Sequence, residues 1–137
     1  MATSDRLSPA AVKLLQEPQI AHVATVMADG SPQVTPVWVD VEDDGSVVMI
    51  NTPEGNLKTN NVAQNPEIAI SVVDKNNAYR LVTLRGTVIE RTTDGADAHI
   101  DKLAQKYLGQ PKYPWHRPGS TRTIWRIKPH HVIERGV

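Results

Sequence analysis

The chain has 137 residues and no formal net charge, because 15 lysines and arginines balance 15 aspartates and glutamates. This length fits a single domain, expected at residues 1–137, and the balanced charge lacks the basic blocks that nucleic-acid binding normally uses. There is no cysteine, which excludes disulfides and thiolate metal sites, and no apolar run approaches a membrane span, so we expect a cytoplasmic protein without nucleic-acid or membrane partners.

The first part of the chain predicts a short helix followed by three strands. Ser8 followed by Pro9 is a helix-start signal, and residues 10–16 can continue the helix. The strand-like segments that follow are separated by tight turns rich in aspartate and glycine, which predicts an antiparallel meander. These strands are expected at residues 20–27, 33–41 and 46–51.

Pro36 interrupts the second of these strands. Because proline cannot donate a hydrogen bond to a ladder, this strand should be bulged or should lie at a sheet edge. A broken ladder leaves neighbouring backbone groups free to contact a ligand.

The segment from Asn51 to Asn61 has the pattern of a strand end, a tight turn and the start of a helix expected at 56–64. Backbone N–H groups at a helix start are unpaired and carry the positive end of the helix dipole, so Lys58 beside them can complete an anion site. Asn61 follows three residues after Lys58, hence on the same helical face. The same pattern also fits an ordinary surface turn before a polar helix.

The second part of the chain predicts further strands and a third helix. Residues 67–74 contain a near-continuous apolar run, which predicts a strand buried on both faces. A long strand should follow at 79–91, with a bend or bulge at Gly86. The remaining expectations are a helix at 95–108 capped by Thr93-Asp94 and ended by Gly109, a loop at 110–120, and strands at 121–127 and 131–135 joined at Lys128-Pro129.

The sum of these elements is a mainly β fold with six or seven antiparallel strands and three short helices. Strands this numerous in a small chain usually close into a barrel, because closure removes exposed sheet edges.

The histidines do not predict a metal site. His130 and His131 are consecutive near an expected strand, so their side chains should point to opposite faces and cannot easily chelate one ion. His99 lies among apolar positions of the expected third helix, which favours a packed or hydrogen-bonded histidine over a catalyst.

Short motifs in a fixed order resemble a known family. These motifs are Ala24-Thr25, Asp29-Gly30-Ser31-Pro32-Gln33, Pro36-Val37-Trp38, Asn51-Thr52, Lys58-Thr59-Asn60-Asn61, Asn65-Pro66, Tyr79-Arg80, Arg85-Gly86, His99-Ile100-Asp101-Lys102-Leu103 and Lys106-Tyr107-Leu108-Gly109. The chain resembles, from about residue 14 to 133, the split β-barrel flavin and deazaflavin oxidoreductases, the PPOX-class (pyridoxamine phosphate oxidase-like) probable coenzyme F-420-dependent enzymes. The resemblance implies a split β-barrel that forms a homodimer, with a cofactor in each of two interface grooves.

The resemblance also implies positions for the cofactor. Its phosphate is expected near Lys58, and its isoalloxazine-type ring against the backbone from Thr35 to Trp38, with Gln33 beside it. Tyr79, Arg80 and Trp115 are candidates for residues contributed across the dimer. The full set of cofactor-binding candidates is Gln33, Thr35, Pro36, Val37, Trp38, Asn51, Thr52, Lys58, Asn61, Tyr79, Arg80 and Trp115.

One departure from the family bears on the choice of cofactor. The pyridoxine phosphate oxidases carry a serine-arginine-lysine run where this chain has Asn56-Leu57-Lys58. One arginine fewer suits a longer cofactor whose negative charge extends into solvent, as in F-420 with its oligoglutamate tail. We therefore expect an F-420-dependent oxidoreductase that transfers a hydride to an electron-poor conjugated small molecule. An FMN-dependent oxidoreductase and a non-catalytic F-420 carrier are the alternatives, and the sequence identifies neither catalytic residues nor the substrate.

Overall fold

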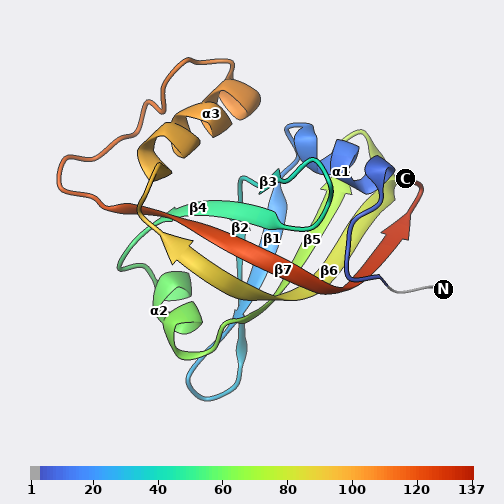
Figure 1. Cartoon of the computed structure of the whole chain (residues 1–137), viewed down its shortest axis with the longest axis horizontal. Helices are drawn as coiled ribbons and strands as arrows, with labels where there is room; N and C mark the ends of the chain where they lie inside the picture. The colour runs from blue at the N-terminus through green and yellow to red at the C-terminus, as the bar shows by residue number, and fades with distance from the viewer. Residues whose placement is uncertain (1–3) are drawn as a thin grey trace.

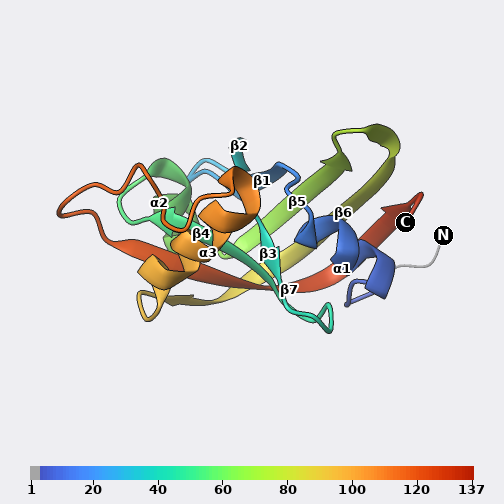
Figure 2. The same cartoon turned by 90° about the horizontal axis from the view of Figure 1, so that it is seen from above.

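The computed structural model describes residues 4–137, which form three helices and one seven-stranded antiparallel sheet (Figures 1 and 2). The strand order is β2-β1-β5-β6-β7-β4-β3, and the sheet curls into a half-barrel. The predicted fold class is confirmed. The elements are α1 (Pro9–Gln16), β1 (Ala21–Val26), β2 (Pro32–Val37), β3 (Asp40–Val41), β4 (Val48–Pro53), α2 (Leu57–Gln64), β5 (Glu67–Asp74), β6 (Asn77–Thr92), α3 (Ala96–Leu108) and β7 (Arg122–Arg135).

The chain crosses from one edge of the sheet to the other between β2 and β3. β2 pairs with β1, and β4 pairs with β3, as the predicted turns indicate. The single strand predicted at 33–41 is instead split into β2 and β3 at opposite edges, so the three-strand meander is wrong. The turn residues indicate where the chain reverses, but no local signal marks the crossover after Val37. Pro36 lies on the edge strand β2, where it pairs with His22 of β1, which confirms the predicted edge position. The crossover segment is anchored by Val39, which is fully buried.

β6 and β7 form the longest ladder of the sheet. The two strands predicted around Pro129 are instead the single strand β7, because a register shift between Arg85 and Gly86 in β6 accommodates the proline opposite Gly86. A Cβ atom at Gly86 would lie 2.5 Å from the carbonyl oxygen of Lys128. The predicted bulge is thus confirmed, and glycine is required there by the close approach of β7.

The core lies on the concave face of the sheet. Its largest fully buried side chains include Trp125 on β7 and Leu14 and Leu15 on α1. In β5, Ile68, Ile70 and Val72 are buried but the alternate residues are half-buried or exposed, so the prediction of burial on both faces is wrong for the single chain. The sequence does not reveal this alternation of buried and exposed positions, because Ala69 and Val73 on the more exposed face are also apolar.

The helices pack around the rim of the half-barrel: α1 against β3 and β6, α2 against β1, and α3 against β4 and β7 (Figure 1). Ser8 caps α1 by accepting a hydrogen bond from the Ala11 N–H, as its position predicted. α3 begins after Gly95 without a side-chain cap, so the prediction of a Thr93-Asp94 cap is wrong. It ends at Gly109 in the left-handed conformation, as predicted.

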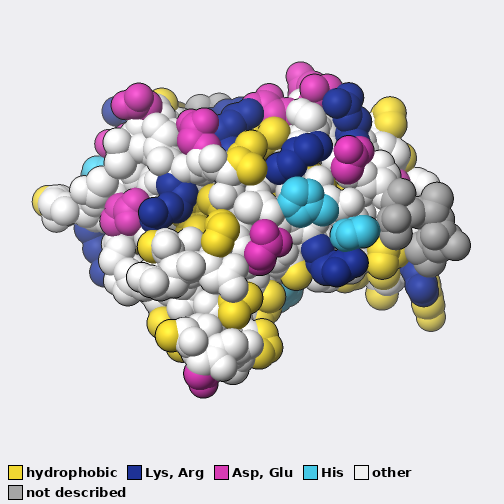
Figure 3. Space-filling model, turned by 60° about the horizontal axis from the view of Figure 1, so that its bottom comes forward, with side chains coloured by type: hydrophobic (Ala, Val, Ile, Leu, Met, Phe, Trp, Pro, Cys, Tyr) yellow, Lys and Arg dark blue, Asp and Glu magenta, His cyan; other side chains and the backbone are white. Residues whose placement is uncertain are grey.

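Two further features describe the surface. Charges of both signs are interspersed with apolar side chains on the face in Figure 3. Within residues 4–137, no helix combines the length and apolarity needed to cross a bilayer.

Candidate functional site

A pocket of about 260 Å³ joins the two segments that the sequence singled out. The end of β2 and the residue after it provide one wall, the end of β4 and Lys58 of α2 provide another, and α3 and the start of β7 complete it. The sequence-predicted lining residues are Pro36, Val37, Trp38, Asn51, Thr52 and Lys58, and the structure adds Ile20, Pro53, Ile100, Tyr113 and Arg122.

The strand-turn-helix segment positions Lys58 through a local cap. The side chain of Asn56 accepts a hydrogen bond from the Thr59 N–H at 3.0 Å, which starts α2 directly after β4. Asn56 also donates to Thr52 Oγ1 at 3.0 Å, so the turn is tied back to the strand. This arrangement places Lys58 in the first turn of the helix, in the pocket wall.

Two cations share this pocket without an acidic neighbour in its wall. Burial lowers the pKa of Lys58, and the positive charge of Arg122 lowers it further. Burial also lowers the pKa of Arg122, although Tyr113 and the negative charge of Asp97, which lies outside the pocket wall, oppose part of this effect. Among residues 4–137, none of those that line the pocket is aspartate or glutamate. A bound anion would offset both the desolvation and the mutual repulsion of the two cations, so the pocket has the electrostatics of an anion site.

Arg122 is held from two sides. Its Nε donates a 2.6 Å hydrogen bond to Asn51 Oδ1, and its guanidinium carbon lies 4.9 Å from the centroid of the Tyr113 ring. The backbone N–H of Tyr113 donates in turn to Asp101 Oδ1 of α3 at 2.9 Å. The guanidinium is therefore fixed in the pocket wall before any ligand binds.

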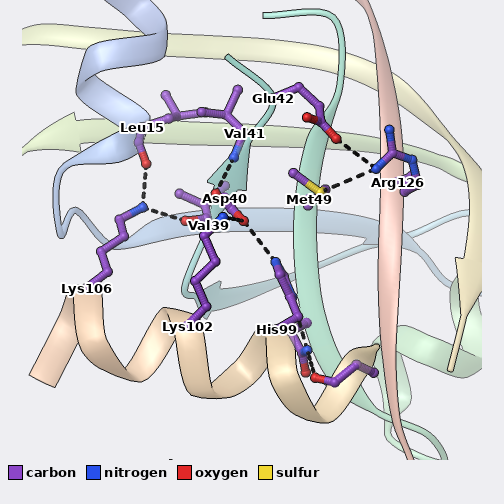
Figure 4. Close-up of polar contacts among 12 residues, drawn as sticks. Leu15, Val39, Asp40, Val41, Glu42, Met49, His99, Lys102, Lys106 and Arg126 are labelled. Carbon is purple, nitrogen blue, oxygen red and sulfur yellow. Dashed lines mark hydrogen bonds and ion pairs between the residues drawn. The ribbon is translucent and has the colours of Figure 1, made fainter. Parts of the chain in front are cut away.

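The amide of Asn51 continues this arrangement towards α3. Its Nδ2 donates to the carbonyl oxygen of Ala96 at 2.8 Å and lies 3.1 Å from His99 Nδ1. His99 Nε2 lies 3.0 Å from Asp40 Oδ2 (Figure 4). The prediction that His99 is a hydrogen-bonded histidine is confirmed.

Asp40 is a buried carboxylate that stays ionised. Burial opposes its charge, but the hydrogen bonds from His99 and the Val41 N–H, together with the charge of Lys102, lower its pKa to about 2. Its side chain is 10% exposed, and Lys102 Nζ lies 3.3 Å from Oδ2 (Figure 4). Asp40 thus anchors α3 to β3 through a fixed negative charge.

α3 also fixes the aromatic wall of the pocket. The Trp38 ring stacks on Tyr107 with centroids 4.9 Å apart and planes 4° from parallel. Tyr107 Oη accepts a hydrogen bond from the Val39 N–H at 3.0 Å and donates to the Gln19 carbonyl at 2.6 Å. Lys106 Nζ donates to the carbonyls of Val39 and Leu15 (Figure 4). The crossover after β2 is thereby clamped, and Trp38 is held in the pocket wall.

The ionisable groups of this clamp are strongly affected by burial. Burial lowers the pKa of Lys106 to about 8 and raises that of Tyr107 to about 12. Tyr107 therefore remains a neutral hydrogen-bond donor near neutral pH.

Three of the other sequence candidates lie outside this pocket. Gln33 and Thr35 are half-buried on β2, further from its end. Asn61 is buried, and its amide donates to Thr25 Oγ1 at 3.0 Å, so its side chain turns towards β1 and not towards Lys58's pocket.

None of the three candidates for cross-dimer contacts lines this pocket, although the Trp115 ring lies 5.6 Å from that of Tyr113 in its wall. Tyr79 is 86% exposed, and Arg80 forms ion pairs with Glu17 and Asp74, which raise its pKa. Trp115 lines an adjoining cavity of about 610 Å³ that shares Pro53, Tyr113 and Arg122 with the pocket. The expected roles of Tyr79, Arg80 and Trp115 across a dimer stay predictions.

Sequence reasoning missed Arg122 and Tyr113. Arg122 pairs with Pro53 because β7 runs beside β4, and this pairing joins segments about 70 residues apart. No local motif signals it. Only the strand order of the sheet could have placed Arg122 beside Lys58.

Residues 7–136 match the family model described as pyridoxamine 5'-phosphate oxidase. The chain belongs to this family. The resemblance found in the sequence is thereby confirmed. A search of curated proteins found no match.

Solved structures of the pyridoxamine 5'-phosphate oxidase fold include proteins with different names. A structure called F-420 reductase is 31% identical, with a TM-score of 0.79 over 88% of this chain and 94% of that chain. HupZ from Group A Streptococcus is 25% identical, with a TM-score of 0.68 over 93% of each chain. HutZ from Vibrio cholerae, called a heme storage protein, is 19% identical, with a TM-score of 0.63 over 96% of each chain, which shows the fold alone.

Proposed function

We propose that this protein is an oxidoreductase that binds coenzyme F-420 and transfers a hydride to an electron-poor conjugated small molecule. The observation that carries the proposal is the meeting of two buried cations, Lys58 and Arg122, with the edge-strand segment Pro36–Trp38 in one pocket. The family supports a flavin-type cofactor, and the 31% identical F-420 reductase supports a deazaflavin.

The residues of the pocket fit the parts of such a cofactor. Lys58 and Arg122 would hold its phosphate, and the strand end at Pro36 and Val37 would lie against its ring. Trp38, held by Tyr107, provides a rigid apolar wall that excludes water from one side. When bound, the deazaflavin would supply the hydride, while the chain's own residues bind, orient and shield the reactants.

Arg122 changes the balance between the two cofactors. The sequence has no arginine beside Lys58, and a site with one fixed cation would favour F-420. In the structure, however, Arg122 of β7 supplies a second cation to the same pocket. Two cations also suit the compact phosphate of FMN, which is therefore the second candidate. The preference for F-420 now rests on the likeness to the F-420 reductase.

We also propose that the chain works as a homodimer. A hollow of about 350 Å³ lies over β1, β2, β5, β6 and β7 and is lined by His22, Ala24, Val34, Ala69, Ile70, Ser71, Thr83, Leu84, Arg85, His131 and Ile133. Most of these side chains are small or apolar, and Val34 is 59% exposed at the sheet edge. A second copy would cover the face of β5 that the single chain leaves half-exposed, as the family resemblance implies.

The proposal is tested by cofactor titration of wild type, Lys58→Gln and the control Lys75→Gln. Lys75 is exposed in the turn between β5 and β6, so its substitution removes the same charge away from the pocket. A charge-assisted hydrogen bond is worth about 1.5–3 kcal/mol, so Lys58→Gln should weaken F-420 binding about 10- to 100-fold and Lys75→Gln should not.

Equal binding by wild type and Lys58→Gln would contradict the phosphate assignment. If wild type binds F-420, but none of the quinones, enones or tetrapyrroles tested as acceptors leads to oxidation of reduced F-420, the protein is a carrier and not a reductase.

A further inference from the structure

We propose that Asp40, His99 and Asn51 form a hydrogen-bonded chain that positions Arg122 as the second anion-binding cation of the pocket. The inference rests on the proposed anion site and extends it to residues that act through Arg122. The chain links β3, α3, β4 and β7, so four separate elements determine where one guanidinium lies.

The donors and acceptors fix the direction of every bond in this chain. Arg122 Nε can only donate, so the Asn51 oxygen must face it. The Ala96 carbonyl can only accept, so the Asn51 amide nitrogen must face α3. The second amide hydrogen then points at His99 Nδ1, 3.1 Å away. His99 Nδ1 must therefore accept, which leaves the ring proton on Nε2, facing the Asp40 carboxylate at 3.0 Å.

This arrangement leaves the Asn51 side chain no free hydrogen-bond donor for an anion. Its oxygen and both amide hydrogens are engaged within the protein, and the residue is 9% exposed. Although Asn51 was a sequence candidate for cofactor binding, its polar atoms serve Arg122. Asn51 is thus a positioning residue, and Arg122 is the group that reaches the anion.

Positioning has a physical advantage for binding. An arginine side chain loses rotamer freedom when it binds an anion, and a guanidinium already held by Asn51 and Tyr113 loses less. α3 provides both supports, since His99 holds Asn51 and Asp101 holds the Tyr113 backbone. A purely structural role would instead stabilise α3 and leave anion affinity independent of His99.

The first test observes the hydrogen bonds of Asn51, His99 and Arg122 directly and needs no ligand. Nitrogen NMR of the wild-type protein should show His99 protonated at Nε2 and unprotonated at Nδ1, and the Arg122 Nε–H should exchange slowly with solvent. In His99→Leu this exchange should accelerate about tenfold or more, because Asn51 loses its hydrogen bond to the His99 ring. A proton on Nδ1 of neutral His99, or unchanged exchange in His99→Leu, would overturn the proposal.

The second test is a double-mutant cycle with inorganic phosphate and F-420 as probes. His99→Leu should weaken binding of each probe about 3- to 10-fold, whereas in an Arg122→Gln background it should have no further effect. His99→Gln should bind within twofold of wild type, since its terminal amide offers one donor for Asp40 and one acceptor for Asn51. Circular dichroism and thermal melting check that each variant is folded.

The outcomes separate this inference from the proposed function. Equal weakening by His99→Leu in both backgrounds, or no weakening at all, would show that His99 does not act through Arg122, and would leave the cofactor proposal standing. If folded wild type binds neither phosphate, F-420 nor FMN, the anion site itself is wrong, and both proposals fail.

Discussion

At the scale of single residues, the protein places charged groups where their own solvation is poor. Burial lowers the pKa values of both Lys58 and Arg122, so each cation is less favourable in the free protein than it would be in water. A bound anion reverses this disadvantage. Asp40 differs, because its charge is already stabilised within the protein by the hydrogen bond from His99 and the positive charge of Lys102.

The Asp40 carboxylate makes the stability of the fold depend on acid pH. Its pKa is about 2 in the folded protein against 3.8 as the ordinary value, so between these values the unfolded chain binds more protons. The stabilisation is complete above about pH 4, amounts to about 2 kcal/mol, and is lost as the pH falls towards 2.

Urea unfolding of wild type and Asp40→Asn measures this contribution. The difference in unfolding free energy should shrink by about 1 kcal/mol between pH 7 and pH 3, part of the way through the transition. Glu90→Gln, which removes an exposed carboxylate from β6, is the control and should change stability by less than about 0.5 kcal/mol at both pH values. A pH-independent difference for Asp40→Asn would contradict the account.

At the scale of elements, the site depends on how β7 is built. β7 carries Arg122 at one end and passes Pro129 near its middle, where the bulge at Gly86 keeps β6 and β7 paired. α3 then braces both Arg122 and the crossover after β2. The pocket is thus formed by elements that meet only when the whole sheet is assembled.

Gly86→Ala tests the close contact at this bulge. The added Cβ would lie 2.5 Å from the Lys128 carbonyl oxygen, a backbone atom that cannot move without disturbing the ladder. We expect a loss of about 1–3 kcal/mol in unfolding free energy. Ala78→Val adds carbon atoms at an exposed position of the same strand and should cost less than about 0.5 kcal/mol. Equal stability of Gly86→Ala and wild type would show that the strands separate freely there.

The sequence predicted the features that depend on neighbouring residues. Ser8-Pro9 and Gly109 mark helix ends, and Pro36 marks an edge strand, because caps and missing N–H groups act within a few residues. The predicted turns correctly join β1 to β2 and β3 to β4, but the crossover between β2 and β3 was not predicted, because no turn signal marks a segment that passes to the other sheet edge. The same limit hid Arg122, whose place beside Lys58 depends on the pairing of β4 with β7.

At the scale of the whole molecule, the half-barrel leaves one face of its sheet partly exposed, and we propose that a second copy covers it. Val34 on β2 and Ile89 on β6 are both 59% exposed, but only Val34 lines the hollow proposed as the dimer face. Val34→Glu should therefore lower the mass measured by sedimentation towards that of a monomer, and Ile89→Glu should leave a dimer. A monomeric wild type, or a Val34→Glu variant that stays dimeric, would contradict this assignment.

The central claim is that the pocket between β2, β4 and Arg122 holds a deazaflavin. Parallel titration of the purified protein with F-420 and FMN, at the same salt concentration, tests it most directly. We predict submicromolar binding of F-420 and weaker binding of FMN. Tight binding of FMN without binding of F-420 would contradict the claim.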